Sequence, residues 1–285
     1  MSVAGELKPP AAPATEPRRC RLPANARDWL ALLFRPPRAG VRPAWRSPAR
    51  LALGCLIALA LIAGTMVFMD ARLIIAAAGL PEWVNRLFNE LTDYGTADWL
   101  LVPIGLVLVA IGALDSPALS HWSRLVLVAF TVRLGFVFAA IALPGLFVAI
   151  LKRLIGRARP FIGGEADPFL YLPFAWRPEY ASLPSGHATN VFAALVAVGL
   201  VWPRLRAVML AYALIIAASR VIVLAHHPSD VIAGALVGAF GALLVRDWFA
   251  ARRLGFAVDA RGGVRALPGP SLKRLKAVAR QFAAA

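Results

Sequence analysis

Long apolar runs alternate with short polar segments between residues 51 and 245. A helix needs roughly 20 apolar residues to cross a bilayer core of about 30 Å, and the runs approach that length. The pattern therefore predicts an all-α fold, a polytopic membrane helical bundle with six transmembrane helices. The predicted spans are Leu51–Met69, Trp99–Leu114, Leu125–Leu151, Ala188–Trp202, Leu205–Leu224 and Val231–Val245.

Two segments outside these spans have helical apolar spacing. Residues 81–95 predict a helix lying along the outer membrane interface. Residues 271–282 predict a basic amphipathic helix on the inner leaflet, where anionic lipids attract lysine and arginine. Its lipid-facing side chains would be Leu272, Leu275, Val278 and Phe282.

Composition excludes a soluble domain and limits the partners. The chain of 285 residues is 60% hydrophobic, with a mean hydropathy of +0.69 and a net charge of +16. Residues 1–50 hold ten Lys and Arg against three acids, and residues 246–285 hold nine against two. Such a charge often indicates nucleic acid, but basic tails beside membrane spans are what the positive-inside rule produces. We therefore expect membrane lipids, and no nucleic acid, as partners.

The same charges predict the domain organisation. Residues 1–50 form a basic, Pro-rich cytoplasmic tail, within which residues 9–48 are expected to be disordered. Residues 51–248 form the membrane domain, and residues 249–285 form a second basic cytoplasmic tail with the amphipathic helix. Both termini are then cytoplasmic.

The two larger outer loops differ in charge. Residues 70–98 carry two basic side chains and five acids, as expected outside. The second outer loop breaks the rule, because it is rich in cations. It contains Lys152, Arg153, Arg157, Arg159 and Arg177. Arg153 and Arg157 fit snorkelling at the end of a span, whereas an anion site would explain cations on this side.

Lys152 and Arg159 form the first of three polar blocks. They are seven residues apart, or two helical turns, so they share a helix face as far as the helix persists. Pro160 should end the helix at Arg159. The pair could point at one anionic group, although snorkelling explains these two residues taken alone at least as well.

The second block is Pro184-Ser185-Gly186-His187, which opens an apolar run. Ser185 is a natural N-cap, and Gly186 lets a ligand approach the free backbone N–H groups of a helix start, which favour anions. His187 in the first turn could donate a proton to a bound group. An ordinary helix start with an interfacial histidine is the alternative.

The third block joins Arg220 to His226 and Asp230. An unpaired arginine at mid-membrane depth costs about 2.5–3.5 kcal/mol, so Arg220 should face the protein interior. Asp230 lies four residues after His226 and can accept its Nδ1–H, which leaves Nε2 as an attacking nitrogen. His227 is a competitor, only three residues from Asp230, and a purely structural His–Asp contact is the alternative reading.

Together these blocks resemble the signature of the type 2 phosphatidic acid phosphatase family, whose soluble relatives include vanadium haloperoxidases. The resemblance covers about residues 95–245, and all eleven specified positions match in order. It implies that His226 is the nucleophile that forms a phosphohistidine, that Asp230 orients it, and that His187 is the general acid. It also implies that the phosphoryl oxygens are held by Lys152, Arg159, Ser185, Gly186 and Arg220. No metal and no other cofactor is implied.

The resemblance predicts an integral membrane enzyme of a bacterial inner membrane that hydrolyses a lipid phosphate or diphosphate at the periplasmic face. Candidate substrates are undecaprenyl diphosphate, lipid A, phosphatidylglycerol phosphate and phosphatidic acid. One alternative is a phosphotransferase that moves the phosphoryl group to another lipid. A second is a non-catalytic transporter or scaffold. Nothing in the sequence specifies the oligomeric state or the role of the N-terminal tail.

Overall fold

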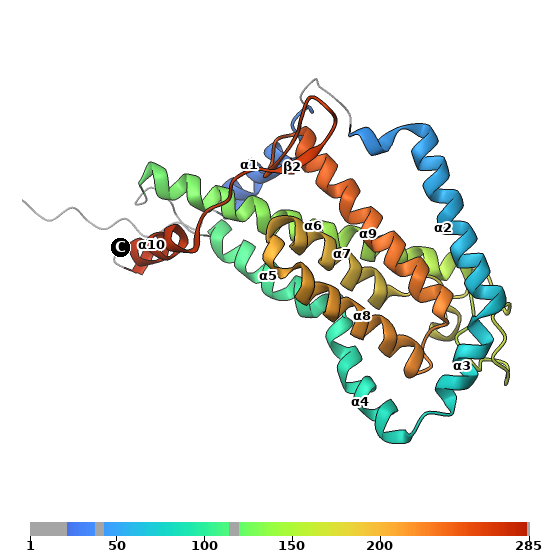
Figure 1. Cartoon of the computed structure of the whole chain (residues 1–285). Helices are drawn as coiled ribbons and strands as arrows, with labels where there is room; N and C mark the ends of the chain where they lie inside the picture. Colours follow the sequence, from blue (N-terminus) through green and yellow to red (C-terminus); the bar gives the residue numbers. More distant parts are fainter. Residues whose placement is uncertain (1–21, 38–42, 114–119, 284–285) are drawn as a thin grey trace, which may run out of the picture.

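The helices of the computed structural model follow the apolar runs of the sequence (Figure 1). The structure describes residues 22–37, 43–113 and 120–283, so residues 1–21 of the predicted tail lie outside it. The predicted spans correspond to α2 Pro48–Phe68, α5 Ala97–Ala113, α6 His121–Ile155, α7 Gly186–Val201, α8 Arg206–Ile222 and α9 Pro228–Ala251. The remaining elements are α1 Leu22–Phe34, α3 Asp70–Ala78, α4 Glu82–Thr92, α10 Leu272–Ala283, β1 Phe256–Val258, β2 Val264–Ala266 and the short 3₁₀ turns η1 Ala44–Arg46, η2 Asp93–Gly95, η3 Pro178–Tyr180 and η4 Pro203–Leu205.

Five helical stretches of the described chain are long and apolar enough to cross a membrane. They are Pro48–Phe68, Glu82–Ala113, His121–Ile155, Pro203–Ile222 and Pro228–Ala251. The helix α7 is also apolar, but with 16 residues it falls below that length. The chain is therefore an integral membrane protein built mainly of helices, as the sequence predicts.

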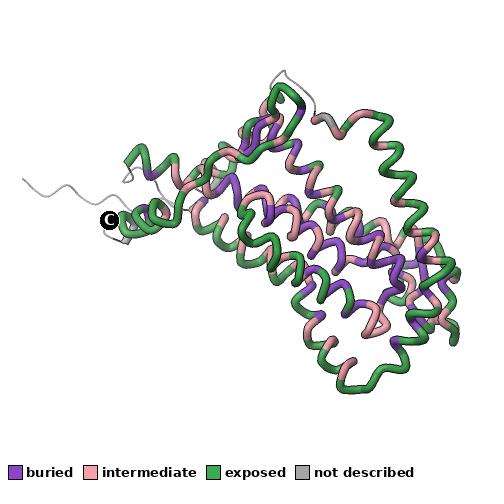
Figure 2. Tube along the Cα trace, in the orientation of Figure 1, coloured by how far each residue is buried: buried purple, intermediate pink, exposed green. Residues whose placement is uncertain are grey.

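The short helix α7 occupies the middle of the bundle, where it packs against α6, α8 and α9 (Figure 2). Its buried face consists mainly of alanine and other small residues, and α9 meets it through Gly234 and Gly238. A Cβ added to either glycine would collide with a backbone carbonyl of α7, that of Ser185 or of Thr189. Small residues let helix backbones approach closely in membranes, and here they bring α9 against α7.

The α2 helix is different, because most of its side chains are exposed in the protein alone (Figure 2). Only Thr65 among its residues is buried. Such a helix, apolar on all sides and uncovered by protein, is expected to face lipid.

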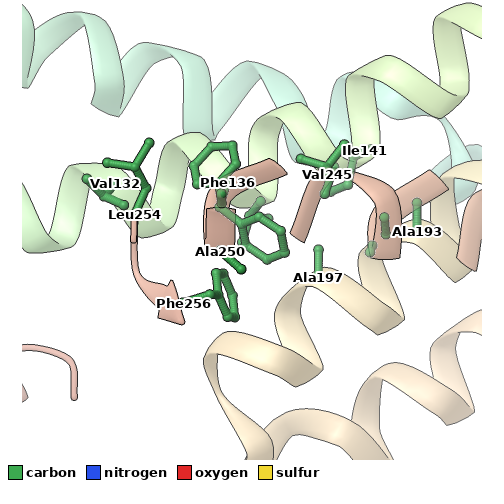
Figure 3. Close-up of a cluster of buried hydrophobic side chains, with 14 residues drawn as sticks. Val132, Phe136, Ile141, Ala193, Ala197, Val245, Ala250, Leu254 and Phe256 are labelled. Carbon is green, nitrogen blue, oxygen red and sulfur yellow. The ribbon is translucent and has the colours of Figure 1, made fainter. Parts of the chain in front are cut away.

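A cluster of apolar side chains closes the bundle at the end where α9 finishes (Figure 3). Phe136 of α6 makes edge contacts with Phe249 of α9 and with Phe256 of β1, at centroid distances of 5.5 and 4.7 Å. β1 pairs antiparallel with β2, with Phe256 opposite Ala266. The segment after α9 thus folds back onto the membrane domain.

Both tails contain more structure than the sequence predicts. Residues 22–34 of the segment expected to be disordered form α1, whose Leu33 carbonyl accepts a hydrogen bond from Trp248 Nε1 at 3.1 Å. The predicted helix near the C-terminus exists as α10, but its Val278 is buried and does not face lipid. Gln281 of α10 accepts a hydrogen bond from Ser123 of α6, so this helix packs on protein. The side chain of Phe282 lies outside the described residues.

The close contact of α7 and α9 predicts a specific sensitivity. Replacing Gly238→Ala should lower the free energy of unfolding by about 1–3 kcal/mol, because the new methyl group must displace the Thr189 backbone. Gly54→Ala on α2 is the matched control, since a Cβ there meets no atom within 4 Å. Thermal unfolding of the purified variants in detergent measures both. Equal midpoints for the two variants would contradict this account of the packing.

Candidate active site

The three polar blocks lie at one end of the bundle. Lys152 is in the last turn of α6, Gly186 and His187 begin α7, and Arg220 is in the last turn of α8. His226 lies in the connection to α9, and Asp230 is in the first turn of α9. Because neighbouring helices run in opposite directions, these alternating ends meet on the same side. The structure therefore brings the predicted site residues to a common region.

The first block leaves the helix earlier than predicted. The α6 helix ends at Ile155, and Gly156 adopts the left-handed conformation with φ of 65°. A Cβ at Gly156 would collide with the carbonyl of Leu172, whose N–H donates to the Gly156 carbonyl at 2.7 Å. Lys152 and Arg159 therefore do not share a helix face, because Gly156 turns the chain before Pro160 can end the helix.

After this turn the chain is extended and pairs with a later loop. The N–H of Arg159 donates to the Glu179 carbonyl at 2.8 Å, and the N–H of Ser182 donates to the Arg157 carbonyl at 3.1 Å. This pairing holds Arg159 beside the segment that leads into the second block. A glycine turn and backbone hydrogen bonds, instead of helical periodicity, position this cation.

Ser185 takes the predicted N-cap position of α7, but its side chain makes no capping hydrogen bond. Its Oγ is buried and has no hydrogen-bond partner among the described residues. Its own N–H donates to the Asp230 carbonyl at 2.9 Å, which ties the second block to the third. The hydroxyl and the first N–H groups of α7 thus remain available to an anion.

Arg220 is buried, as predicted, and its partner is Thr92 at the end of α4. Thr92 Oγ1 accepts from Arg220 Nη1 and also from Ser219 Oγ, the latter at 2.9 Å. Arg220 Nε has no partner in the described chain. The following turn η2 packs on the second block, since a Cβ added to Gly95 would lie 2.9 Å from His187 Cδ2.

His226 and Asp230 are close, but they are joined through a third side chain. His226 Nδ1 lies 3.8 Å from Asp230 Oδ2, beyond a hydrogen bond. Ser182 Oγ lies 3.4 Å from His226 Nδ1 and donates to Asp230 Oδ2 at 2.6 Å. Asp230 Oδ2 also accepts the backbone N–H of His227 at 2.9 Å. The carboxylate is thus placed to orient His226, with the Ser182 hydroxyl beside both groups.

Burial and nearby cations keep the His226 imidazole neutral. Burial lowers the pKa of His226 to about 4, against the opposing effect of Asp230, and the charges of Arg220 and Arg159 lower the pKa further. Its imidazole is therefore neutral at pH 7, as a nitrogen nucleophile must be. The charges of Arg220, His226, Lys152 and Arg159 also act on His187, so these four groups lie within electrostatic range of His187.

Comparison with known proteins places this arrangement in a family. Residues 133–254 match the model of the PAP2 superfamily. The chain is 33% identical over 198 residues to Lipid A 1-phosphatase of Rhizobium etli, covering 69% of this chain and 84% of that protein. It is also 33% identical over 223 residues to Lipid A 1-phosphatase of Rhizobium johnstonii, covering 78% and 89%. The chain belongs to the PAP2 superfamily.

Two solved structures also resemble the chain. The crystal structure of Aquifex aeolicus LpxE has 21% identity and a TM-score of 0.45, covering 62% of this chain and 94% of that chain. The transmembrane PAP2 type phosphatidylglycerolphosphate phosphatase from Bacillus subtilis has 18% identity and a TM-score of 0.45, covering 79% and 94%. Membership of the PAP2 superfamily rests on the sequence matches.

Four residues that contact the site are not among the site residues predicted from the sequence. Arg157, interpreted there as snorkelling, is wholly buried and forms ion pairs with Asp70 and Asp230. Thr92 and Ser182 have no distinctive sequence context. Asp70 gave one usable signal, because it directly follows the first apolar run. Asp70 and Thr92 also precede the segment matched by the PAP2 model, so the family signature could not identify them.

The contact of Thr92 with Arg220 predicts an effect on anion binding. Thr92→Val should weaken binding of inorganic vanadate, a phosphate-shaped oxyanion, by about tenfold or more, because hydrogen bonds to charged groups contribute about 1.5–3 kcal/mol. Thr96→Val is the control, since the Thr96 hydroxyl bonds only the Asp93 carbonyl in the described chain. Calorimetric titration measures both affinities. An unchanged or tighter affinity in Thr92→Val would show that Thr92 does not position Arg220.

Proposed function

We propose that this chain is an integral membrane phosphatase that removes phosphate from a lipid, with lipid A 1-phosphate as its first candidate substrate. The main support is the surroundings of His226. Ser182 lies beside His226 and donates to Asp230. His226 is also within electrostatic range of Arg159, Arg220 and His187. The two relatives named Lipid A 1-phosphatase support the substrate. Undecaprenyl diphosphate, phosphatidylglycerol phosphate and phosphatidic acid are the other candidates.

The proposed reaction has two steps. His226 Nε2 attacks the phosphorus and forms a P–N bond, while the bond between phosphorus and the lipid oxygen breaks and His187 gives that oxygen its proton. Water then attacks the phosphohistidine, His187 takes a proton from the water, and the P–N bond breaks to release phosphate and neutral His226. Asp230 stabilises the positive charge that develops on the His226 ring.

Cations and a helix N-terminus stabilise the transition state in this scheme. Phosphoryl transfer spreads negative charge over three equatorial oxygens, and its catalysis depends mostly on positioning and electrostatics. Lys152, Arg159 and Arg220 provide fixed positive charge, and Ser185 and Gly186 provide a hydroxyl and backbone N–H groups. A bound phosphate also brings negative charge to His187, which favours the protonated form that a general acid needs. We therefore propose that the reaction needs no metal.

The position of the site favours a lipid substrate. Its residues lie at the ends of apolar helices, where the headgroup of a membrane lipid is within lateral reach. We propose that six helices span the membrane, including α7, which is surrounded by α6, α8 and α9. We also propose that both termini are cytoplasmic and that the site is at the periplasmic face of a bacterial inner membrane. The acid-rich segment 70–98 on that face supports this orientation.

Phosphate release tests the function directly. The purified protein should release phosphate from at least one of the four lipids in excess EDTA. His226→Ala should lower the rate to background, and His187→Ala should leave a rate about 10²–10⁴-fold lower, the usual contribution of a general acid. His121→Ala is the control, because His121 is exposed at the opposite end of α6. Activity that chelation abolishes and added metal restores would contradict the phosphohistidine scheme.

The same assay separates hydrolysis from transfer. With a labelled donor lipid, a hydrolase releases free phosphate whether or not an acceptor lipid is present. A phosphotransferase would leave little free phosphate and would label the acceptor.

Cysteine labelling tests the orientation. In a Cys20→Ser, Cys55→Ser background, a membrane-impermeant maleimide should label Glu165→Cys in intact spheroplasts, because Glu165 is exposed on the loop beside the site. Arg204→Cys, in the turn between α7 and α8, should react only after lysis. The reverse pattern would place the site on the cytoplasmic face.

A further inference from the structure

Arg157 occupies an enclosed position beside the site, with none of its surface exposed. Its Nε donates to the Pro168 carbonyl at 3.0 Å, and its Nη1 donates to Ser229 Oγ at 2.7 Å and to Asp230 Oδ1. Its Nη2 donates to Asp70 Oδ2 at 2.7 Å. The guanidinium thus joins the Asp230 carboxylate, beside His226, to the Asp70 carboxylate at the start of α3.

Asp70 is equally buried and is bound from two sides. It begins α3, directly after α2 ends, so the joint between these helices lies at the site. Its Oδ1 accepts the Ser229 N–H at 2.9 Å, and its Oδ2 accepts from Arg157 and from the Ser229 hydroxyl. Asp70 therefore contacts both the first turn of α9 and the guanidinium that holds Asp230.

The charges of this network do not cancel. Asp70 and Asp230 are two carboxylates around one guanidinium, so the group carries a net charge of −1. Burial alone would lower the pKa of Arg157, but Asp230 and Asp70 raise it above the usual value, which keeps the guanidinium charged. Buried ion pairs are a poor source of stability, because desolvation offsets their attraction. A role in the chemistry beside them explains their position better.

We propose that Asp70 is a positioning residue of the active site: by sharing Arg157, it fixes the Asp230 carboxylate and leaves its negative charge available to His226. The inference rests on the proposed function, in which Asp230 orients and stabilises His226. Asp70 lies too far from the reacting atoms to be catalytic, because Arg157 and Ser229 stand between it and Asp230.

Two consequences follow from removing the Asp70 charge. Asp230 would then be the only carboxylate bound to Arg157, whose full positive charge would draw it away from Ser182 and His226. The net charge of the network would also change from −1 to 0. The other charged groups that act on His226 are Arg220, Arg159 and His187, and they remain as they are. The His226 imidazolium would lose stabilisation, so its pKa would fall further.

Asp70→Asn tests the inference, because asparagine has nearly the same shape and no charge. For lipid phosphate hydrolysis we expect kcat to fall about 10- to 100-fold, comparable to the loss when an outer partner of a metal-binding residue is removed, with little change in KM. The acid limb of kcat/KM, which reports the ionisation of His226 in the free protein, should move to lower pH. Glu90→Gln on α4, an exposed acid of the same outer segment, should change neither quantity.

Inorganic vanadate binding and elution as a single species establish that each variant is folded. Asp70→Ser removes the same charge and leaves room for water, so it replaces Asp70→Asn if that variant does not fold. A folded variant with unchanged kcat and an unmoved acid limb overturns the inference, and so does a failure of both variants to fold. If the unchanged protein hydrolyses none of the lipids, the proposed function fails and the inference fails with it.

Discussion

The site depends on the hydrogen bonds that the buried residue Asp230 accepts. It accepts hydrogen bonds from Ser182 Oγ at 2.6 Å, from the His227 N–H at 2.9 Å and from Arg157. Its own backbone carbonyl accepts the Ser185 N–H. A carboxylate without exposed surface keeps its charge only when donors surround it, and its place in the first turn of α9 adds the helix dipole. The segments that carry the chemistry are therefore positioned against one another by one group.

Close helix packing makes this arrangement possible. Gly234 brings the α9 backbone against the carbonyl of Ser185, and Gly238 does the same at Thr189 one turn further along. In a membrane the hydrophobic effect does not draw helices together, so small residues and polar contacts determine which helices approach. The N-termini of α7 and α9, which carry Ser185 and Asp230, are adjacent for this reason.

The sequence predicts the helices well, because apolar runs are a local signal. Apolar runs mark helices of membrane length, and the three blocks match a family signature. The sequence does not distinguish lipid from protein as the neighbour of an apolar face. For this reason the sequence pattern assigns Val278 to lipid, although α10 packs on α6. Likewise the local sequence offers two competing ends for this helix, Gly156 and Arg159-Pro160, and the structure uses the earlier one.

Arg157 shows that local sequence cannot predict contacts between distant residues. An arginine just beyond a span snorkels to water when no carboxylate is within reach and is buried when one is, and both cases have the same local sequence. The deciding residue is Asp70, which is 87 positions away and has the sequence context of an ordinary outer-loop acid. Thr92 is similar, since its contact with Arg220 joins residues 128 positions apart. Contacts of this kind depend on the packing of α3 and α4 against the bundle, which a single sequence does not display.

The cations of the site are divided into two groups with different roles. Arg157 is paired with two carboxylates, and each of its three nitrogens donates at least one hydrogen bond. Arg159 and Arg220 each retain a buried Nε without a partner in the described chain. If Asp230 and Asp70 faced these two arginines as well, the protein itself would neutralise the positive charge that an anion needs. Asp230 and Asp70 form their arginine hydrogen bonds with Arg157 and, in the described chain, not with Arg159 or Arg220. Those two cations therefore keep donors for an anion, as the proposed attack on a bound phosphate requires.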